Sequence, residues 1–229
     1  GRVEVRERYP QNGSSGRHSW HLTSTYTITA PAGTRVTAKS ISGDISVSDI
    51  AGDVTVETVS GNVTLAGLGR VSNARSVSGN VDVSNTRVEG GLTIGSVSGD
   101  VVARKVTAEH LALSSVSGNI TVEDVQCGRV EGHTTSGNTR FTGMLAKSGH
   151  YELKSFSGDV RLALSGETGF EVEASSFSGG VRSDLPLTTH GDEEGQARRR
   201  RRTLSGTYGD GSAVLTLTTF SGSIVISKR

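Results

Sequence analysis

The residues that could do chemistry in this chain of 229 residues are few and scattered. The histidines lack the regular spacing of a metal site, and no Ser-His-Asp arrangement stands out among the many regularly placed serines. Hydrolysis of a glycan would need clustered carboxylates, and the pairs Glu123-Asp124 and Asp49/Asp53 are better explained as solvated turn residues. We therefore expect no catalytic residue, no metal and no cofactor. The six histidines are His18, His21, His110, His133, His150 and His190.

Two other features are explained without a special activity. The single cysteine, Cys127, cannot form an internal disulfide, and we expect it to be a small buried core residue. The run of five arginines at residues 198–202 suggests a nucleic-acid site, but acidic residues at 192–194 precede it and the net charge of the chain is only +1. We interpret the run as part of a solvated loop and expect no nucleic-acid partner.

A repeated six-residue phrase organises the chain. In Ser76-Val77-Ser78-Gly79-Asn80-Val81 and its eight other copies a glycine holds the fourth place, and successive glycines are 18 to 21 residues apart except for a last interval of 43. A worn copy, Leu204-Ser205-Gly206-Thr207, lies inside that interval. These phrase glycines are Gly43, Gly61, Gly79, Gly99, Gly118, Gly137, Gly158, Gly179 and Gly222.

The repeat predicts an all-β fold. Apolar residues alternate within each period, as in Val54/Val56 and Leu92/Ile94, which is typical of strands with one buried face. Equal copies of such a short unit must stack to bury that face. We therefore predict a single-domain β-solenoid, a parallel β-helix, with about ten coils of 18–21 residues. His133 and His150 would lie in neighbouring coils, and we place both on the surface.

The phrase also predicts a corner of the coil. We expect each phrase glycine to adopt a positive φ there, and the Asn or Asp that follows it to bond to the next coil. No two carboxylates are adjacent in this polar ladder, as repulsion at the spacing of one coil would require. Its members are Asp44, Asn62, Asn80, Asp100, Asn119, Asn138 and Asp159.

The apolar residue inside each phrase leaves two alternatives open. Val97 follows the inward Ile94 by three positions, which in an unbroken strand would place the two side chains on opposite faces. Val97 also precedes the inward Val101 by four positions, so a bulge or corner would return it to the core. We favour the core alternative; the other is an exposed, sticky stripe. The stripe consists of Ile41, Val59, Val77, Val97, Val116, Phe156, Phe177 and Phe220.

The chain divides into four parts of one continuous domain. Residues 1–40 are atypical N-terminal strands or a cap, residues 41–183 are regular repeats, residues 184–203 are a charged loop insert, and residues 204–229 are the final coils. A terminal coil exposes unpaired backbone groups. We expect the C-terminal edge either to be covered by the insert or to pair with another subunit, which would give head-to-tail self-association.

The phrase resembles that of a bacterial adhesin-type family of β-strand-repeat proteins whose function is unknown. The stretch Leu204-Ser205-Gly206-Thr207 and the ending Thr219-Phe220-Ser221-Gly222 are similar to the family's C-terminal part, and Tyr26-Thr27-Ile28 leading to Pro31 is similar to its opening. The resemblance covers residues 22–229. It implies an extracellular or cell-envelope protein, with a signal or anchor that is absent from this chain, and it supplies no catalytic residues.

These observations predict a non-enzymatic surface or envelope scaffold. Its long faces would be presented to an unknown surface ligand, either a protein or a glycan. Two alternatives stay open, a polysaccharide-acting enzyme built on a β-helix and a subunit of a self-assembling filament.

Overall fold

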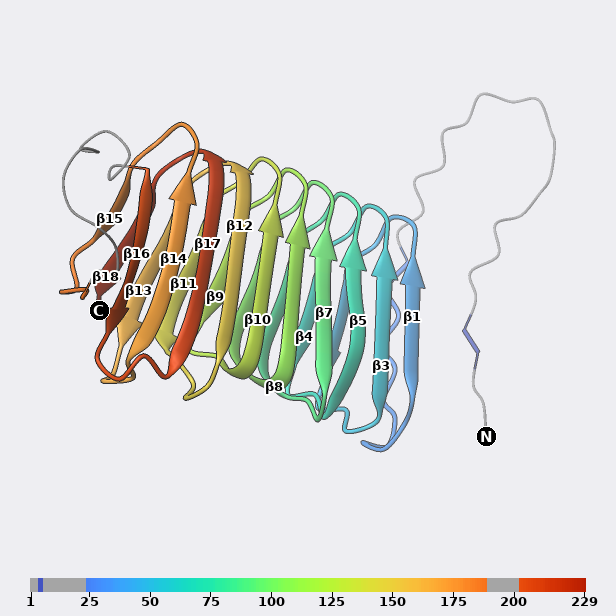
Figure 1. Ribbon diagram of the computed structural model, residues 1–229. Helices are drawn as coiled ribbons and strands as arrows, with labels where there is room; N and C mark the ends of the chain where they lie inside the picture. The colour runs from blue at the N-terminus through green and yellow to red at the C-terminus, as the bar shows by residue number, and fades with distance from the viewer. Residues whose placement is uncertain (1–3, 6–23, 189–201) are drawn as a thin grey trace, which may run out of the picture. The chain divides into compact units, whose positions relative to one another are not determined.

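The computed structural model describes residues 4–5, 24–188 and 202–229. The chain forms two compact units, Gly1–Ala30 and Pro31–Arg229. In the first unit, residues 4–5 and 24–30 are described and contain no strand. The fold described below is that of the second unit, shown in Figure 1. No helix capable of crossing a membrane is present among the described residues.

The strands of Pro31–Arg229 form two faces that the chain visits alternately (Figure 1). One strand, β8 (Val101–Ser115), continues from one face to the other, so its two halves belong to different faces. Face A consists of β1 (Val36–Ser40), β3 (Asp53–Thr58), β5 (Arg70–Ser76), β7 (Gly91–Ser96), the second half of β8, β10 (Gln126–Thr134), β12 (His150–Ser157), β14 (Phe170–Ser176), β16 (Thr203–Tyr208) and β17 (Ala213–Ser221). Face B consists of β2 (Ile45–Ser48), β4 (Val63–Ala66), β6 (Val81–Arg87), the first half of β8, β9 (Ile120–Glu123), β11 (Thr139–Met144), β13 (Val160–Ser165), β15 (Val181–Ser183) and β18 (Ile224–Lys228).

Every strand except β16 pairs in parallel with strands of neighbouring coils, so the predicted all-β, parallel β-solenoid is confirmed. Each coil contributes one strand to face A and one to face B. The pairings within the described residues give nine such coils, one fewer than the ten predicted. The difference arises because Leu204–Thr207, the worn copy of the phrase, is not a coil but part of β16, which pairs with β14 in the antiparallel direction.

The core lies between the two faces, and inward and outward residues alternate along each strand. The inward side chains are almost completely buried, as in Leu92, Ile94, Leu111 and Leu113. The residues between them, Thr93 and Ala112, are only half-buried. The last inward residue of each regular face A strand is a buried serine or threonine, such as Ser96. The Ser96 hydroxyl donates to the Gly79 carbonyl oxygen at 2.8 Å and accepts from the Gly99 amide at 3.0 Å. These two bonds satisfy the buried hydroxyl.

The last coil is out of sequence order. Strand β17 lies between β12 and β14, and β18 lies between β13 and β15, so residues 213–228 fill a space between the coil of residues 150–165 and the coil of residues 170–183. In Figure 1 the red β17 lies between the yellow β12 and the orange β14. The C-terminal strand is therefore paired on both sides. Both expectations for it, a cover formed by the insert and a free edge, are wrong.

The predicted positive φ at the phrase glycines is also wrong, because none of the nine is among the residues of positive φ. The reason for glycine is steric. A Cβ built on Gly118 would lie 2.0 Å from the carbonyl oxygen of Gly99 in the adjacent coil, and the other phrase glycines show the same close approach except Gly43, at the start of the row. Stacked backbones at this corner leave no room for a side chain.

The left-handed residues lie at the other corner of the coil. Asp49, Asn85, Lys105 and Asp124 have φ between 49° and 57°, and Gly67 occupies the equivalent place with a φ of 64°. Asp and Asn tolerate this conformation better than most residues. The chain therefore uses two different corners, one close-packed and one left-handed.

Candidate functional site

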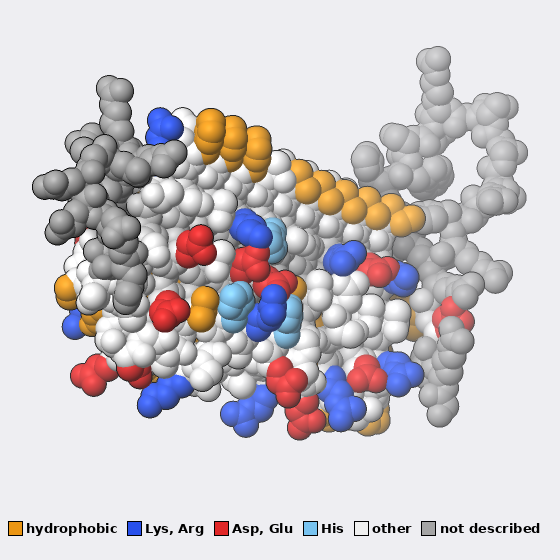
Figure 2. Space-filling view, viewed as in Figure 1, with side chains coloured by type: hydrophobic (Ala, Val, Ile, Leu, Met, Phe, Trp, Pro, Cys, Tyr) orange, Lys and Arg blue, Asp and Glu red, His pale blue; other side chains and the backbone are white. Residues whose placement is uncertain are grey.

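An exposed apolar ridge runs along the corner between the two faces. Its apolar side chains are those of the stripe described above. The prediction that they enter the core is wrong, because they are 43% to 79% exposed. Figure 2 shows them as a group of three followed, after a gap, by a longer row. In spatial order the ridge consists of Ile41, Val59, Val77, Val97, Val116, Thr135, Phe156, Phe220 and Phe177.

The outward direction of the ridge follows from the buried hydroxyls. Because Ser96 is an inward residue, the alternation that starts at Leu92 and Ile94 continues unbroken through it, and the next residue, Val97, must point outward. The chain turns only after Val97, at Gly99. Because the inward residue at this position is a serine and not an apolar residue, the apolar pattern of the sequence does not show that Val97 points outward.

The ridge ends in three stacked phenylalanines, which we call the phenylalanine ladder. Phe220, from the intercalated coil, lies between Phe156 and Phe177, with ring centroids 4.9 Å and 4.6 Å away and interplanar angles of 0° and 7°. The three side chains are 57%, 44% and 64% exposed in the order Phe156, Phe220 and Phe177. The neighbouring rings cover both faces of Phe220, and Phe220 covers one face of each neighbour. Thr135, exposed and polar, separates the ladder from the valines.

An open groove follows the phenylalanine ladder on face A. Its outer side is formed by four residues in register on adjacent strands, His133, Lys154, Thr218 and Ser175. The three ladder rings form its other side, so the walls of the groove are mostly apolar. An elongated ligand with apolar side chains is suited to such a channel.

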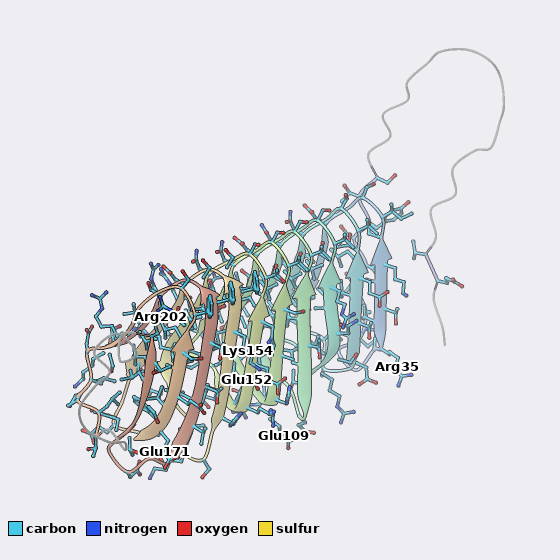
Figure 3. The ribbon with its side chains drawn as sticks, turned by 45° about the horizontal axis from the view of Figure 1, so that its top comes forward. Arg35, Glu109, Glu152, Lys154, Glu171 and Arg202 are labelled. Carbon is cyan, nitrogen blue, oxygen red and sulfur yellow. The ribbon has the colours of Figure 1, made fainter. Side chains whose placement is uncertain are left out.

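Charged side chains lie next to the groove, and they are paired. Arg129 Nε donates to Glu131 Oε1 at 2.6 Å, and His110 Nε2 is 3.7 Å from Glu131 Oε2. Lys154 forms an ion pair with Glu152, and Figure 3 shows both side chains on face A. The hydrogen bond from Lys154 lowers the pKa of Glu152, so this carboxyl is ionised at neutral pH.

His133 and His150, predicted to lie at the surface of neighbouring coils, lie on face A beside this pair. Both lower the pKa of Glu152 through their charge, after the larger effect of Lys154. His133 is exposed and His150 is half-buried.

The four carboxylates of the pairs Glu123-Asp124 and Asp49/Asp53 have structural roles. Three of them form ion pairs, and the fourth lies in a turn. Glu123 accepts from Arg104 at 3.2 Å and Asp124 from Arg229 at 2.8 Å. Asp53 accepts from Arg35 at 3.0 Å, and Asp49 is one of the left-handed residues. Arg104 also donates a hydrogen bond to Asp82 at 2.5 Å, and this bond raises the pKa of the Arg104 guanidinium. These are surface ion pairs between coils.

The polar ladder residues are brought together, and their side chains bind backbone rather than only one another. Asp100 Oδ1 accepts from the Asn119 backbone amide at 2.7 Å and from the Asn119 side chain at 3.1 Å. The same contact recurs from Asp44 to Asn62 and onward to Asp159, whose Oδ1 accepts from the amide of Ser223 at 2.9 Å. The ladder thus passes directly from residue 159 to the intercalated coil.

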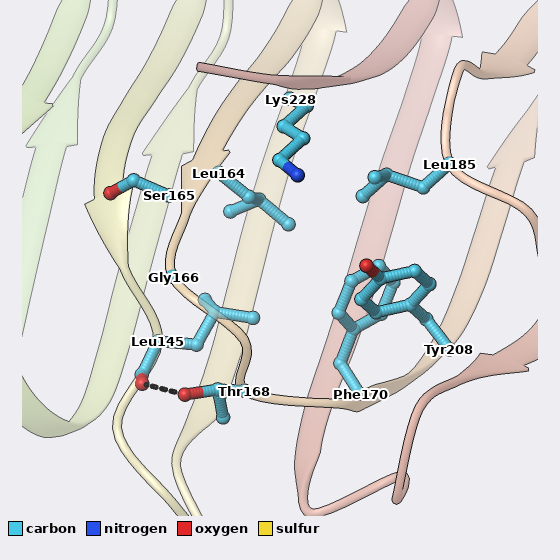
Figure 4. Close-up of a pocket in the computed structure, with 9 residues that line it drawn as sticks. All are labelled: Leu145, Leu164, Ser165, Gly166, Thr168, Phe170, Leu185, Tyr208 and Lys228. Carbon is cyan, nitrogen blue, oxygen red and sulfur yellow. Dashed lines mark hydrogen bonds between the residues drawn. The ribbon is translucent and has the colours of Figure 1, made fainter.

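Two remaining places lack the features of a ligand site. Cys127 is buried, and burial raises the pKa of its thiol to about 11. The small pocket of Figure 4, beside the stacked Phe170 and Tyr208, has space for about 10 Å³, which is no more than one water. Thr168 Oγ1 donates to the Leu145 carbonyl at its edge, at 3.1 Å.

Within the described residues, no three His, Cys, Asp or Glu side chains are grouped so as to hold a metal ion. His18, His21, His190 and residues 198–201 of the arginine run lie outside the part of the chain that the structure describes.

Comparison with known proteins gives a family. No curated protein and no solved structure matches the chain significantly. The sequence model of the Toastrack DUF4097 family matches residues 21–104 and 147–227, which is well over half of the chain. The residues between the two matches form the second half of β8 and strands β9, β10 and β11, which continue the same coil geometry and carry Arg129, Glu131 and His133. The chain belongs to the Toastrack DUF4097 family, a family of repetitive β-structures whose function is unknown.

Proposed function

We propose that this solenoid is a non-enzymatic, adhesin-like scaffold of a bacterial surface or envelope that holds a protein partner along the apolar ridge. The observation that carries the proposal is the exposure of eight large apolar side chains in one row, interrupted at a single position, Thr135. Soluble proteins seldom leave a contiguous apolar surface of this kind without a partner. The regular spacing of the coils makes the row rigid, since every ridge residue is fixed by strand pairing on both sides of its corner.

A protein partner is favoured over a glycan by the geometry of the phenylalanine ladder. Sugars stack on the open faces of aromatic rings, whereas the faces of Phe220 are covered by Phe156 and Phe177. The exposed ring edges and the valines suit the apolar side chains of another protein. Hydroxyl groups flank the ridge, as at Ser98 and Ser117, and give it the polar rim typical of an interface.

Binding is favoured over catalysis by the state of the carboxylates beside the groove. A glycosidase needs one carboxyl with a raised pKa to protonate the leaving group. The pKa of Glu152 is lowered by Lys154, and Glu131 is held by Arg129. A carboxyl with a lowered pKa, such as that of Glu152, is a poor proton donor to a leaving group.

Site-specific photocrosslinking in the producing cells tests the proposal. A photoreactive phenylalanine analogue placed at Phe220 is compared with the same analogue at Thr64, an exposed residue of β4 on face B. We expect one discrete crosslinked protein species from position 220 and none from position 64, and we expect Phe177→Ser to reduce its yield. Equal crosslinking from both positions would contradict a ridge-specific partner. Release of products from a panel of polysaccharides by the purified protein would contradict the non-enzymatic assignment.

A further inference from the structure

The slot that residues 213–228 occupy is a binding site made of two separate coils. The coil of residues 150–165 and the coil of residues 170–183 lie on opposite sides of it. The two strands with which β14 pairs in the described structure are β16 and β17, and both belong to residues 203–229. The coil of residues 170–183 is thus joined to the rest of the solenoid chiefly through the C-terminal segment.

The intercalated coil is bound by every type of contact that the solenoid uses. Leu215, Leu217, Ile224 and Ile226 are at most 1% exposed, so they enter the common core. On one side, Thr219 Oγ1 donates to the Gly158 carbonyl at 2.9 Å. The glycine row and the phenylalanine ladder pass through this coil without interruption, and the polar ladder reaches it at the amide of Ser223.

None of these contacts depends on the coil belonging to the same chain. Thirteen residues, 189–201, connect Thr188 to Arg202, and a chain of that length can span up to about 45 Å when extended. The same segment of a second molecule would present the same strands, glycine and phenylalanine to the slot. Exchange of a terminal element of this kind preserves the contacts of the monomer while it joins two molecules.

We propose that the coils of residues 150–165 and 170–183 bind the C-terminal segment, residues 203–229, of a second copy of this chain, whose residues 213–228 fill the slot between them. The product is a coil-exchanged dimer in which each molecule completes the solenoid of the other. The intramolecular form is favoured in dilute solution, because the attached segment reaches its own slot without a bimolecular encounter. Exchange therefore requires high protein concentration and release of the coil. This inference is independent of the proposed binding function.

Engineered cysteines test the exchange in the full-length protein. Lys154 and Thr218 are Cα partners on β12 and β17, which is within the reach of a disulfide. One protein carries Lys154→Cys and a second carries Thr218→Cys, and the two are unfolded together, refolded at protein concentrations from about 0.01 to about 1 mM and then oxidised. The native Cys127 is buried in the core and should stay unreactive.

We expect a disulfide-linked dimer whose yield rises with the refolding concentration and is at least about tenfold higher than in the same proteins mixed after folding. The matched control replaces Lys154→Cys by Ser114→Cys, an exposed residue of face A three coils from Thr218, and should give only a background yield. The single chain with both Lys154→Cys and Thr218→Cys should form its disulfide internally. Equal dimer yields with Ser114→Cys, or no dimer at any concentration, would overturn the proposal. Failure of the double variant to form its bond would overturn the register on which it rests.

Discussion

Replacement of Gly118 by alanine should destabilise the solenoid strongly. The new Cβ would lie 2.0 Å from the Gly99 carbonyl oxygen and 2.4 Å from its carbon, whereas ordinary contacts begin near 3.4 Å. The two coils would have to separate locally by roughly 1.4 Å, more than a hydrogen bond tolerates. The bonds at risk are those from Ser115 Oγ to Gly99 at 3.0 Å and from the Asn119 amide to Asp100 at 2.7 Å.

The expected loss is about 2–4 kcal/mol in the free energy of unfolding, from net contributions of about 1 kcal/mol for each broken hydrogen bond and the cost of overpacking. Gly43→Ala is the matched control, because the same atom there meets only the flexible Ser40 hydroxyl, at 3.1 Å. We expect that variant to lose less than about 1 kcal/mol. Urea unfolding monitored by circular dichroism gives both values.

Two explanations for the glycine at position 118, a close approach of backbones and a requirement for positive φ, predict different effects of an asparagine there. Asparagine is among the side chains that best tolerate the left-handed region, so a φ requirement would make Gly118→Asn milder than Gly118→Ala. The close approach of the backbones makes Gly118→Asn at least as damaging. Equal stability of Gly118→Ala and Gly43→Ala, or rescue by asparagine, would refute the reasoning.

Three further outcomes follow from the described contacts. Ser115→Ala leaves two buried backbone groups of the glycine row unpaired and should cost about 1–3 kcal/mol in thermal or urea unfolding, whereas the exposed Ser117→Ala should cost less than about 0.5 kcal/mol. Lys154 lowers the pKa of Glu152 below its ordinary 4.5, so the stability that the pair adds is present above that pH and is lost as the pH falls through the folded pKa. Wild type and Lys154→Met should therefore differ in unfolding at neutral pH and converge once the pH lies below the folded pKa of Glu152. Cys127, with its pKa raised to about 11, should react with a thiol reagent at about pH 8 only after unfolding, and fast reaction of the native protein would contradict its burial.

The repeat alone was enough to predict the class of fold. A glycine every 18 to 21 residues with apolar alternation between copies requires stacked coils, and the inward placement of Leu92 and Ile94 agrees with the structure. The direction of Val97 cannot be predicted from the spacing of the apolar residues alone. Ser96 continues the inward series. Its hydroxyl can be buried because it forms hydrogen bonds with backbone groups of two coils, at Gly79 and Gly99, and these contacts cannot be recognised in the sequence.

The position of the last coil could not be predicted for a different reason. The interval of 43 residues before Gly222 equals about two periods, so an additional coil near Leu204 was the simplest interpretation. The actual order in space is decided by which coils pair, and identical phrases give almost equal pairing in several orders. The charged groups beside the groove were found singly, as His133 and His150, but their approach to Glu152 depends on the register between coils.

The most direct test of the account is the accessibility of two adjacent positions, one inward and one on the ridge. Ser96→Cys and Val97→Cys differ by one residue along the chain, and their side chains are predicted to lie on opposite sides of the coil wall. The rate of maleimide labelling is measured for each folded variant in dilute solution and divided by the rate for the same variant unfolded in denaturant. We expect Val97→Cys to react at close to its unfolded rate and Ser96→Cys to be protected by at least about a thousandfold, as for a group exposed only by opening of the core. Equal protection at both positions would place the ridge in the core and contradict the outward direction of Val97.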